Sequence, residues 1–468
     1  MGRTVQLLAL AGILLSLLTG CGRLPAPDRS GELVVAIRSG VASYSVEEGK
    51  ASGFEYDLIE AFAASQGWRV RYVVAGDPAR LLSLVRERQV HFAASAWLGE
   101  STDLQYSRPL LEANPVLVGY GDEIGSETGA EDLDGKQVAV MYGSPQVQAL
   151  QKMAGTPPRF TIEMRTDMTE LDLLRDVNER KIPFAAADSL QFNLALHYLP
   201  DLEIALPLPG KVRYAWAFSP DQDALRKKVD DFIGTIANRN GLLDRLRDKY
   251  FGYIERVKTE GLLDFYHLMR IRLPRYRRMF EDAQASSGID WRLLAAVAFQ
   301  ESKWDPLATS PTNVRGMMML TEDTADRLGV SDRLDPRQSI RAGARYLADL
   351  RDQLPDEVHE PDRTWLALAA YNLGMGHLNA ARTIATQLKR DQNSWYDMKQ
   401  VLPLLSRPEV YTRLKSGLGR GGEAVILVEN IRTYVDILNR FQPAAEPALK
   451  FNLGSGARPY KGVKLKAQ

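Results

Sequence analysis

The chain has 468 residues, of which 45% are hydrophobic and 25% charged, and its formal net charge is zero. This length and composition can fill two ordinary hydrophobic cores, and they exclude a fibrous chain or one that is disordered throughout. The chain has no excess of basic residues that would favour binding to nucleic acid, so we expect no nucleic-acid partner. A local basic patch is still compatible with a net charge of zero.

A targeting segment opens the chain. Residues 1–20 contain a basic Arg3 and then an apolar run that is too short to span a bilayer comfortably. The letters LTGC at 18–21 resemble a bacterial lipobox, which implies cleavage before Cys21, lipidation of this cysteine and attachment to the periplasmic face of the outer membrane. Cys21 is the only cysteine, so it cannot form an intramolecular disulfide. The alternative is a plain secretory signal with an incidental cysteine.

An α/β pattern follows the signal. Residues 21–31 are polar and proline-bearing, which is typical of a tether. From residue 32 to 255, strand-like runs alternate with amphipathic helical patterns, which indicates βαβ units and a mainly parallel sheet. The strand-like runs include LVVAIRS and VRYVVAG, and the helical patterns include FEYDLIEAFAASQGW and LLSLVRERQ.

Several segments of this region resemble solute-binding proteins of the amino-acid transport type. They are GFEYDLIEAFAASQGW, LLSLVRERQVHFAASA, YSRPLLE, DLDGKQVAVMYGSPQ and ANRNGLLDRLRDKYFG. The resemblance implies a two-lobed periplasmic-binding-protein-like domain that closes around a small ligand. We expect the chain to cross between the lobes at 119–122 and 207–212, with the second lobe at 133–206.

The ligand residues of this domain are predicted from the same resemblance. Relatives hold an amino-acid carboxylate with an arginine, but the corresponding stretch here, WLGESTDLQYS, contains none, and Arg108 is nearby but out of register. Asp188 matches a position that holds an ammonium group, with a loop acid bonded to its local backbone as the alternative. Gly143 and Ser144 precede a predicted helix and could present backbone N–H groups to an anion. We expect a cell-wall-derived peptide or amino acid.

The composition becomes helical from residue 256. One predicted helix places Leu294, Val297 and Ala298 on one face, and Glu301 continues that face, while Asp290 can cap the first turn. Burial disfavours the charged form of a carboxylate, so this glutamate is suited to act as a general acid near neutral pH. The alternative is a glutamate in a structural ion pair near a helix end.

Three blocks around and after this glutamate resemble the soluble lytic transglycosylases, a goose-type-lysozyme-like family. They are ESKWDPLATS with GMMM, then AAYNLGMGHL, and then ENIRTYV. The resemblance implies an all-α lysozyme-like domain at 256–445 that cleaves peptidoglycan between MurNAc and GlcNAc. In this family the glutamate, here Glu301, acts as acid and base, and a 1,6-anhydro-MurNAc end forms without water. Asn313 and Val314 stand where the family usually has Gly and Ala. Met319 replaces the usual Gln, which puts a polar contact to the sugar in doubt.

Substrate contacts are also implied by the resemblance. Tyr371 and Asn372 would orient the sugar or the glutamate, and Ser310 would donate to the N-acetyl group. Met318 would form an apolar wall against a sugar ring; the alternative is that it fills the hydrophobic core. Tyr434 would face the cleft or else be a buried tyrosine bonded to backbone. The register of Glu429 against the family block is ambiguous.

Residues 446–468 read as a mobile basic tail. The sequence has no HExxH motif and no paired CxxC, so we expect no metal and no cofactor.

The order of modules resembles membrane-bound lytic transglycosylases, which implies that the first domain regulates the second. Two alternatives remain: a lysozyme-type hydrolase of the same bond, and a non-enzymatic solute receptor with a cell-wall-binding domain.

Overall fold

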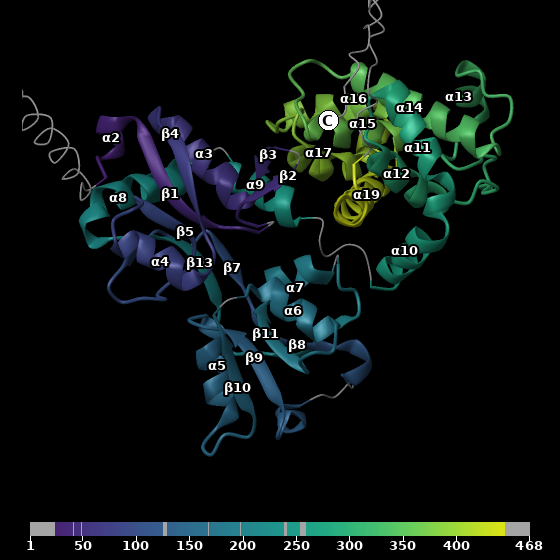
Figure 1. Cartoon of the computed structure of the whole chain (residues 1–468). Coiled ribbons are helices and arrows are strands. Elements are labelled where there is room, and N and C mark those ends of the chain that lie inside the picture. The colour runs from purple at the N-terminus through teal and green to yellow at the C-terminus, as the bar shows by residue number, and fades with distance from the viewer. Residues whose placement is uncertain are drawn as a thin grey trace, which may run out of the picture. The chain divides into compact units, whose positions relative to one another are not determined.

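The computed structural model describes residues 24–444 except 41, 48, 125–128, 167, 197, 238–240 and 253–258. The signal segment with Cys21 and the predicted basic tail therefore lie outside the described residues. Contacts divide the chain into two units, one formed by residues 1–266 with 376–433 and the other by 267–375 with 434–468. Figure 1 labels their helices and strands.

The first lobe of the first unit is built on a mainly parallel sheet of order β4-β1-β5-β13-β6, with β7 beside β13. β1 pairs in parallel with β4 and β5, and β13 is antiparallel to β5. Its strands are β1 (Glu32–Arg38), β4 (Arg69–Ala75), β5 (Phe92–Trp97), β6 (Gln105–Tyr106), β7 (Leu111–Ala113) and β13 (Val212–Phe218), with a separate hairpin of β2 (Ser45–Glu47) and β3 (Lys50–Ser52). Its helices are α2 (Pro27–Ser30), α3 (Phe54–Gln66), α4 (Pro78–Arg86), α8 (Asp223–Asp231) and α9 (Leu242–Phe251), with the 3-10 helix η3 (Pro220–Gln222) and the π-helix η4 (Phe232–Ala237).

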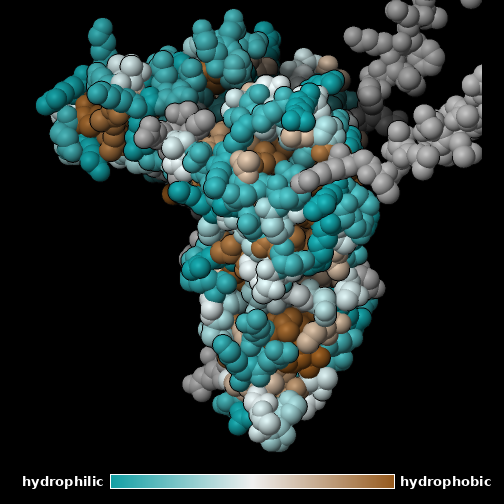
Figure 2. Space-filling model, turned by 90° about the vertical axis from the view of Figure 1, so that its left-hand side faces the viewer, coloured by the Kyte–Doolittle hydropathy of each residue, from teal (hydrophilic) through white to brown (hydrophobic). Residues whose placement is uncertain are grey.

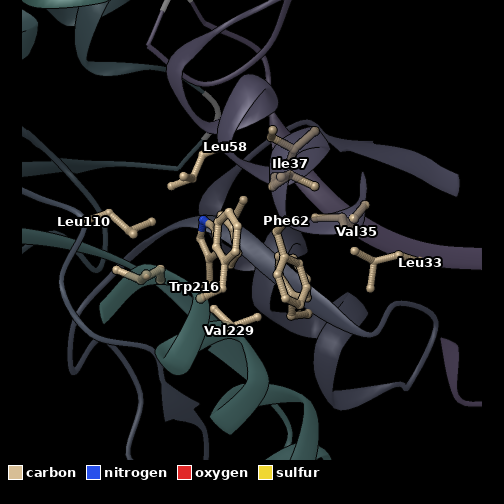
Figure 3. Close-up of a cluster of buried hydrophobic side chains, with 14 of the residues drawn as sticks. Leu33, Val35, Ile37, Leu58, Phe62, Leu110, Trp216 and Val229 are labelled. Atoms are coloured by element: carbon tan, nitrogen blue, oxygen red, sulfur yellow. The ribbon is translucent and has the colours of Figure 1, made fainter. Parts of the chain in front are cut away.

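The core of this lobe explains the apolar strand patterns. β1 is buried on both faces because helices cover the sheet, so its sequence is a continuous apolar run. The ring of Trp216 stacks on Phe92 with centroids 4.8 Å apart, and Phe62 packs beside Trp216. Figure 3 shows these aromatic and aliphatic side chains converging from the strands and from α3 and α8.

The second lobe has a sheet of order β10-β9-β11-β8-β12, in which β9 is parallel to β10 and β11, and β8 is antiparallel to its neighbours. The strands are β8 (Pro115–Tyr120), β9 (Gln137–Met141), β10 (Thr161–Arg165), β11 (Phe184–Asp188) and β12 (Leu202–Pro207). The helices are α5 (Pro145–Ala154), α6 (Glu170–Asn178) and α7 (Ser189–Leu196), with the 3-10 helices η1 (Gly121–Glu123) and η2 (Ala130–Leu133).

The two crossings between the lobes lie side by side. The chain leaves the first sheet after β7 and enters the second at β8, so the first crossing is at Asn114 and the prediction of 119–122 was wrong. The apolar run at 115–120 is a strand of the second lobe, and hydrophobicity alone does not say which sheet a strand joins. The second crossing, between β12 and β13, falls within the predicted 207–212. Lys211 Nζ donates to Asn114 Oδ1 at 2.8 Å and connects the two crossings.

In the second unit, α12 packs against α11 and α14. α11 contacts α12 and α14, and α14 contacts α15. The carboxylate of Asp290 accepts a hydrogen bond from the Arg292 N–H at 2.7 Å, which caps α12 as predicted. The helix ends where Lys303 adopts the left-handed conformation, with φ of 53°. The bounds are α11 (Leu273–Ser287), α12 (Trp291–Ser302), α13 (Glu322–Arg327), α14 (Pro336–Asp352) and α15 (Asp362–Leu373).

Further helices belong wholly or partly to the first unit. They are α10 (Thr259–Ile271), α16 (Met375–Gln387), α17 (Trp395–Val401), η5 (Leu402–Ser406), α18 (Pro408–Tyr411) and α19 (Gly421–Phe441). Across the part of the chain that the structure describes, no helix combines the length and apolar character needed to cross a membrane. On the face drawn in Figure 2, hydrophilic side chains predominate and hydrophobic ones form separate small patches. The predicted fold class, a two-lobed α/β domain followed by a helical one, is confirmed.

Candidate functional site

Glu301 lies in the last turn of α12, a helix of 12 residues in which seven side chains are buried. Its side chain is half-buried. Removal of its carboxyl from solvent raises the pKa of Glu301 to about 7. A carboxyl group with this pKa is present in both protonation states near neutral pH, which suits a group that must give and then take a proton.

The loop after α12 depends on a serine hydroxyl and on a glycine. The hydroxyl of Ser302 lies 2.9 Å from the carbonyl oxygens of both Ala298 and Met317, which ties the helix end to the loop. Gly316 has φ of +84°, and a Cβ there would lie 1.8 Å from the carbonyl oxygen of Arg333. Only glycine fits such a position, so steric exclusion of a side chain explains why the GMMM motif begins with glycine.

Tyr371 comes from α15 and supports the same loop. Its hydroxyl donates to the carbonyl oxygen of Met318 at 2.8 Å. Burial, with the nearby charge of Glu301 as the next cause, raises the pKa of Tyr371 well above its usual value, so the hydroxyl stays protonated. The ring of Tyr346 lies 5.2 Å from that of Tyr371, and the guanidinium of Arg327 lies 5.2 Å from Tyr346. Sequence reasoning missed Tyr346, which lies on an amphipathic helix without a motif of its own.

The remaining predicted substrate residues differ in exposure. Asn372 is exposed beside Tyr371. The Ser310 hydroxyl lies 3.0 Å from that of Thr312 and accepts from the Val314 N–H at 3.1 Å, so it helps to shape its own turn.

Two of the predicted substrate residues, Tyr434 and Met318, have buried side chains. Tyr434 is 6% exposed, and its ring meets that of Phe299 of α12 edge-on at 4.8 Å. Met318 is fully buried against Gly343, where a Cβ would lie 2.8 Å from the methionine side chain. The prediction that Met318 forms an apolar wall against a sugar is therefore corrected, because this methionine is a core residue.

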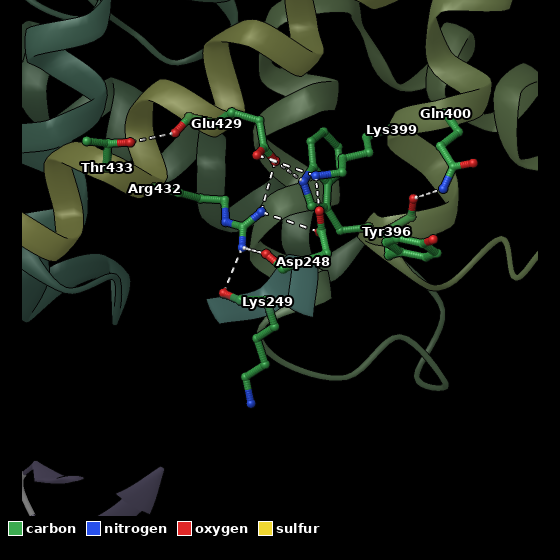
Figure 4. Close-up of polar contacts among 9 residues, drawn as sticks. Asp248, Lys249, Tyr396, Lys399, Gln400, Glu429, Arg432 and Thr433 are labelled. Carbon is green, nitrogen blue, oxygen red and sulfur yellow. Dashed lines mark hydrogen bonds and ion pairs between the residues drawn. The ribbon is translucent and has the colours of Figure 1, made fainter. Parts of the chain in front are cut away.

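Glu429 is also corrected. Its side chain is fully buried, and its Oε1 accepts hydrogen bonds from Trp395 Nε1 at 2.6 Å and from Arg432 Nη1 at 2.9 Å. Lys399 lies 3.5 Å from Oε2 and also pairs with Asp248 of α9. Figure 4 shows these side chains pointing toward one another from α9, α17 and α19. A carboxylate enclosed by its own ion pairs has no free face for a sugar, so its role is structural.

Asp188 ends β11 and is fully buried. One carboxylate oxygen accepts from the backbone N–H groups of Leu190 and Gln191, at 2.8 and 3.0 Å, and the other accepts from the hydroxyl of Tyr214. Burial raises the pKa of Asp188. The local backbone bonds match the alternative that Asp188 is an acid bonded to its own backbone segment.

Gly143 and Ser144 line a cavity of about 410 Å³ at the start of α5. Gly143 has φ of +75°, and the buried hydroxyl of Ser144 has no hydrogen-bond partner. Glu100, from the loop after β5, reaches the same cavity, and burial raises its pKa to about 7. Arg108 does not line this cavity; its guanidinium lies against Gly234, where a Cβ would be 2.9 Å from Nη1.

A second cavity, of about 300 Å³, is lined by residues from both lobes. Arg38, at the end of β1, and Glu170, at the start of α6, belong to its lining together with Tyr214. No motif or spacing in the sequence pointed to Arg38 or Glu170. Among the residues that the structure describes, no group of three or more metal-ligating side chains is placed to hold a metal ion.

Comparisons with known proteins match both parts of the chain. Residues 33–253 match the family model for bacterial extracellular solute-binding proteins, family 3, and residues 278–394 match the transglycosylase SLT domain. The membrane-bound lytic murein transglycosylase F of Thiobacillus denitrificans is 40% identical over 458 residues, which cover 97% of each chain. The protein of the same name from Nitrosospira multiformis is 40% identical over 442 residues, with 91% of each chain covered.

Among solved structures, an amino acid ABC transporter substrate-binding protein from Streptococcus pneumoniae bound to L-arginine is similar to part of this chain. Its sequence is 21% identical, and the TM-score is 0.43. The match covers 49% of this chain and 98% of that one.

Proposed function

Because this chain belongs to the membrane-bound lytic murein transglycosylase F family, it is a peptidoglycan lytic transglycosylase with an N-terminal ligand-binding domain, and we propose that Glu301 is its catalytic acid and base. The observation that supports this role is a desolvated carboxyl group with a pKa of about 7 at the end of α12. It stands in the ESKWDPLATS motif, and its loop is held by Ser302 and Gly316.

The proposed reaction needs one carboxyl group. Protonated Glu301 gives its proton to the glycosidic oxygen while the bond from that oxygen to the anomeric carbon of MurNAc breaks. The C6 hydroxyl of the same MurNAc then bonds to the anomeric carbon and returns its proton to Glu301. No water is consumed and the enzyme regains its starting state. A nucleophile that is already part of the substrate avoids the entropic cost of a second encounter.

We assign supporting roles from the same geometry. Tyr371 positions the loop after α12 by its bond to the carbonyl of Met318, so it keeps Glu301 in place without touching the reacting atoms. Asn372 and Ser310, which are more exposed, are the proposed sugar contacts. Tyr434 supports α12 through Phe299.

The domain limits and the location are also proposals. We assign the ligand-binding domain to 32–255 and the transglycosylase domain to 256–445. We place the enzyme on the periplasmic side of a membrane, in line with the name of its relatives, and propose anchoring in the outer membrane by a lipid at Cys21, which the LTGC letters support. Labelled palmitate is expected to be incorporated into the wild type and not into Cys21→Ser; equal incorporation into both forms would refute the anchor.

The first domain is proposed to sense a cell-wall-derived ligand. A ligand that binds the closed lobes better than the open ones shifts their equilibrium and can thereby change the access of murein to Glu301. A peptide or an amino acid fits the family resemblance of residues 33–253.

The test of the reaction is the product formed in water labelled with heavy oxygen. Purified sacculi are digested by the full-length protein, and the released muropeptides are weighed by mass spectrometry. The proposal expects 1,6-anhydro ends without heavy oxygen. Hydrated, labelled ends would show a lysozyme-type hydrolase, and no release would show a receptor that only binds the wall.

A further inference from the structure

An exposed cation of the second unit lies two ring contacts from the surroundings of Glu301. It is Arg327, in the last turn of α13, and its guanidinium lies 5.2 Å from the ring centroid of Tyr346 on α14. The ring of Tyr346 in turn lies 5.2 Å from that of Tyr371. Burial and then the charge of Glu301 raise the pKa of Tyr371, so this tyrosine is near the proposed catalytic carboxyl.

Arg327 has no carboxylate partner among the residues that the structure describes. Its contact is with the ring of Tyr346, and the acids Glu322 and Asp323 stand in the first turn of α13, at the opposite end of that helix. Contact with an aromatic ring holds a guanidinium in place without using its N–H groups. The planar fork of donors therefore stays available to a carboxylate from outside the protein.

The charge of Arg327 does not act on the catalytic carboxyl itself. Burial is the one cause that raises the pKa of Glu301, and no cation opposes it. A cation at this place can instead act on a charged group of the substrate. MurNAc carries a peptide stem on its lactyl group, and this stem has free carboxylates. Three residues of an extended stem span up to about 11 Å, so its carboxylates can lie well away from the bond that is cleaved.

We propose that Arg327 binds a carboxylate of the peptide stem, so that the enzyme prefers murein whose stem carboxylates are free. The inference rests on the proposed role of Glu301 and adds a specificity-determining residue together with the substrate group that it recognises. The stem does not take part in bond cleavage, so its contact with Arg327 is equally strong before and during the reaction. Such a contact lowers KM and leaves kcat unchanged.

The test measures the release of anhydro ends by the full-length protein from soluble glycan strands that carry peptide stems. One sample of strands keeps its stem carboxylates free, and in the other they are converted to carboxamides. For the wild type, this conversion is expected to raise KM about tenfold and to change kcat by less than about twofold. The difference in KM should shrink at high salt, because the guanidinium is exposed to solvent.

Variants assign the preference to one side chain. Arg327→Met keeps an apolar stem beside Tyr346 and removes the charge, so its KM for the free carboxylates should rise to that for the carboxamides; Arg327→Gln is a second variant with the same expectation. Arg341→Met is the control, because this exposed arginine lies roughly 140° around α14 from Tyr346. It should keep the wild-type preference.

Three results would overturn the inference. The wild type could cleave both kinds of strand equally well, or the folded Arg327 variants could keep the preference. They could also lose the same activity on both kinds of strand, which would show that Arg327 only supports Tyr346 or the end of α13.

The outcome is separable from that of the proposed role of Glu301. If Glu301→Gln is inactive and the wild type shows no preference for free carboxylates, only the inference about Arg327 fails. If Glu301→Gln still releases anhydro ends, the role of Glu301 fails, and the comparison of the two kinds of strand still decides the role of Arg327.

Discussion

Replacing Arg432 with methionine is expected to destabilise the first unit through the buried ion network of α9, α17 and α19. Arg432 is 5% exposed in its side chain and Glu429 is fully buried, so the change leaves a carboxylate without its closest cation. Loss of one partner of a buried pair costs about 3–5 kcal/mol. Lys399 remains 3.5 Å from Glu429, and Trp395 still donates to it, so we expect the lower part of that range.

The assay is urea unfolding followed by circular dichroism, with a double-mutant cycle. Arg432→Met and Glu429→Met are measured singly and together, and the double variant should recover part of the loss, because an apolar pair replaces a buried ion pair at little cost. Arg420→Met is the matched control: its partner Glu423 is 3.7 Å away and both side chains are mostly exposed, so the change should cost under about 0.5 kcal/mol. A loss at Arg432 no larger than this control would refute the reasoning.

Three further predictions concern the site. Gly316→Ala should lower the melting temperature and the activity together, since its Cβ would meet the Arg333 carbonyl; unchanged melting would contradict the steric argument. Tyr371→Phe should lower kcat about tenfold, with a stability loss of about 1 kcal/mol from the missing bond to Met318, as checked by kinetics and melting curves. The rate should fall above a pH of about 7 as Glu301 loses its proton, and a flat profile from pH 6 to 8 would contradict this.

The same group makes a prediction about stability. The folded pKa of Glu301 is raised to about 7 from 4.5, so between these values the folded state binds more protons than the unfolded one. The wild type should therefore lose stability relative to Glu301→Gln as the pH rises from about 4.5 to 7. Melting temperatures of both proteins at pH 5 and pH 8 check this, and a constant difference between them would argue against a desolvated carboxyl.

The sequence predicts a functional residue best when the residues around it in the chain form a recognisable motif. Glu301 and Gly316 lie in one short motif, and the alternation of strands and helices gives the α/β class. Met318 matches its alternative, a core residue, and Glu429 lies in a buried ion network, because a family block identifies a position and not the direction of its side chain. Arg38 and Glu170 come from distant segments and different lobes, and only the folded chain brings them to one cavity.

The first crossing between the lobes illustrates the same limit. The strand at 115–120 is as apolar as its neighbours, and its sheet is fixed by pairing with β11 and β12, which no local pattern encodes. Asn114, where the chain turns, is a residue that favours turns anywhere in a chain.

The most direct test of the central claim is the initial rate at which anhydro-muropeptides leave sacculi at pH 7. Glu301→Gln is compared with the wild type and with Glu357→Gln, a carboxyl change at an exposed position of the same unit. A single carboxyl that acts as acid and base predicts a loss of at least about 100-fold for the first variant and none for the second. Release of ring-closed ends by Glu301→Gln at the wild-type rate would contradict the account.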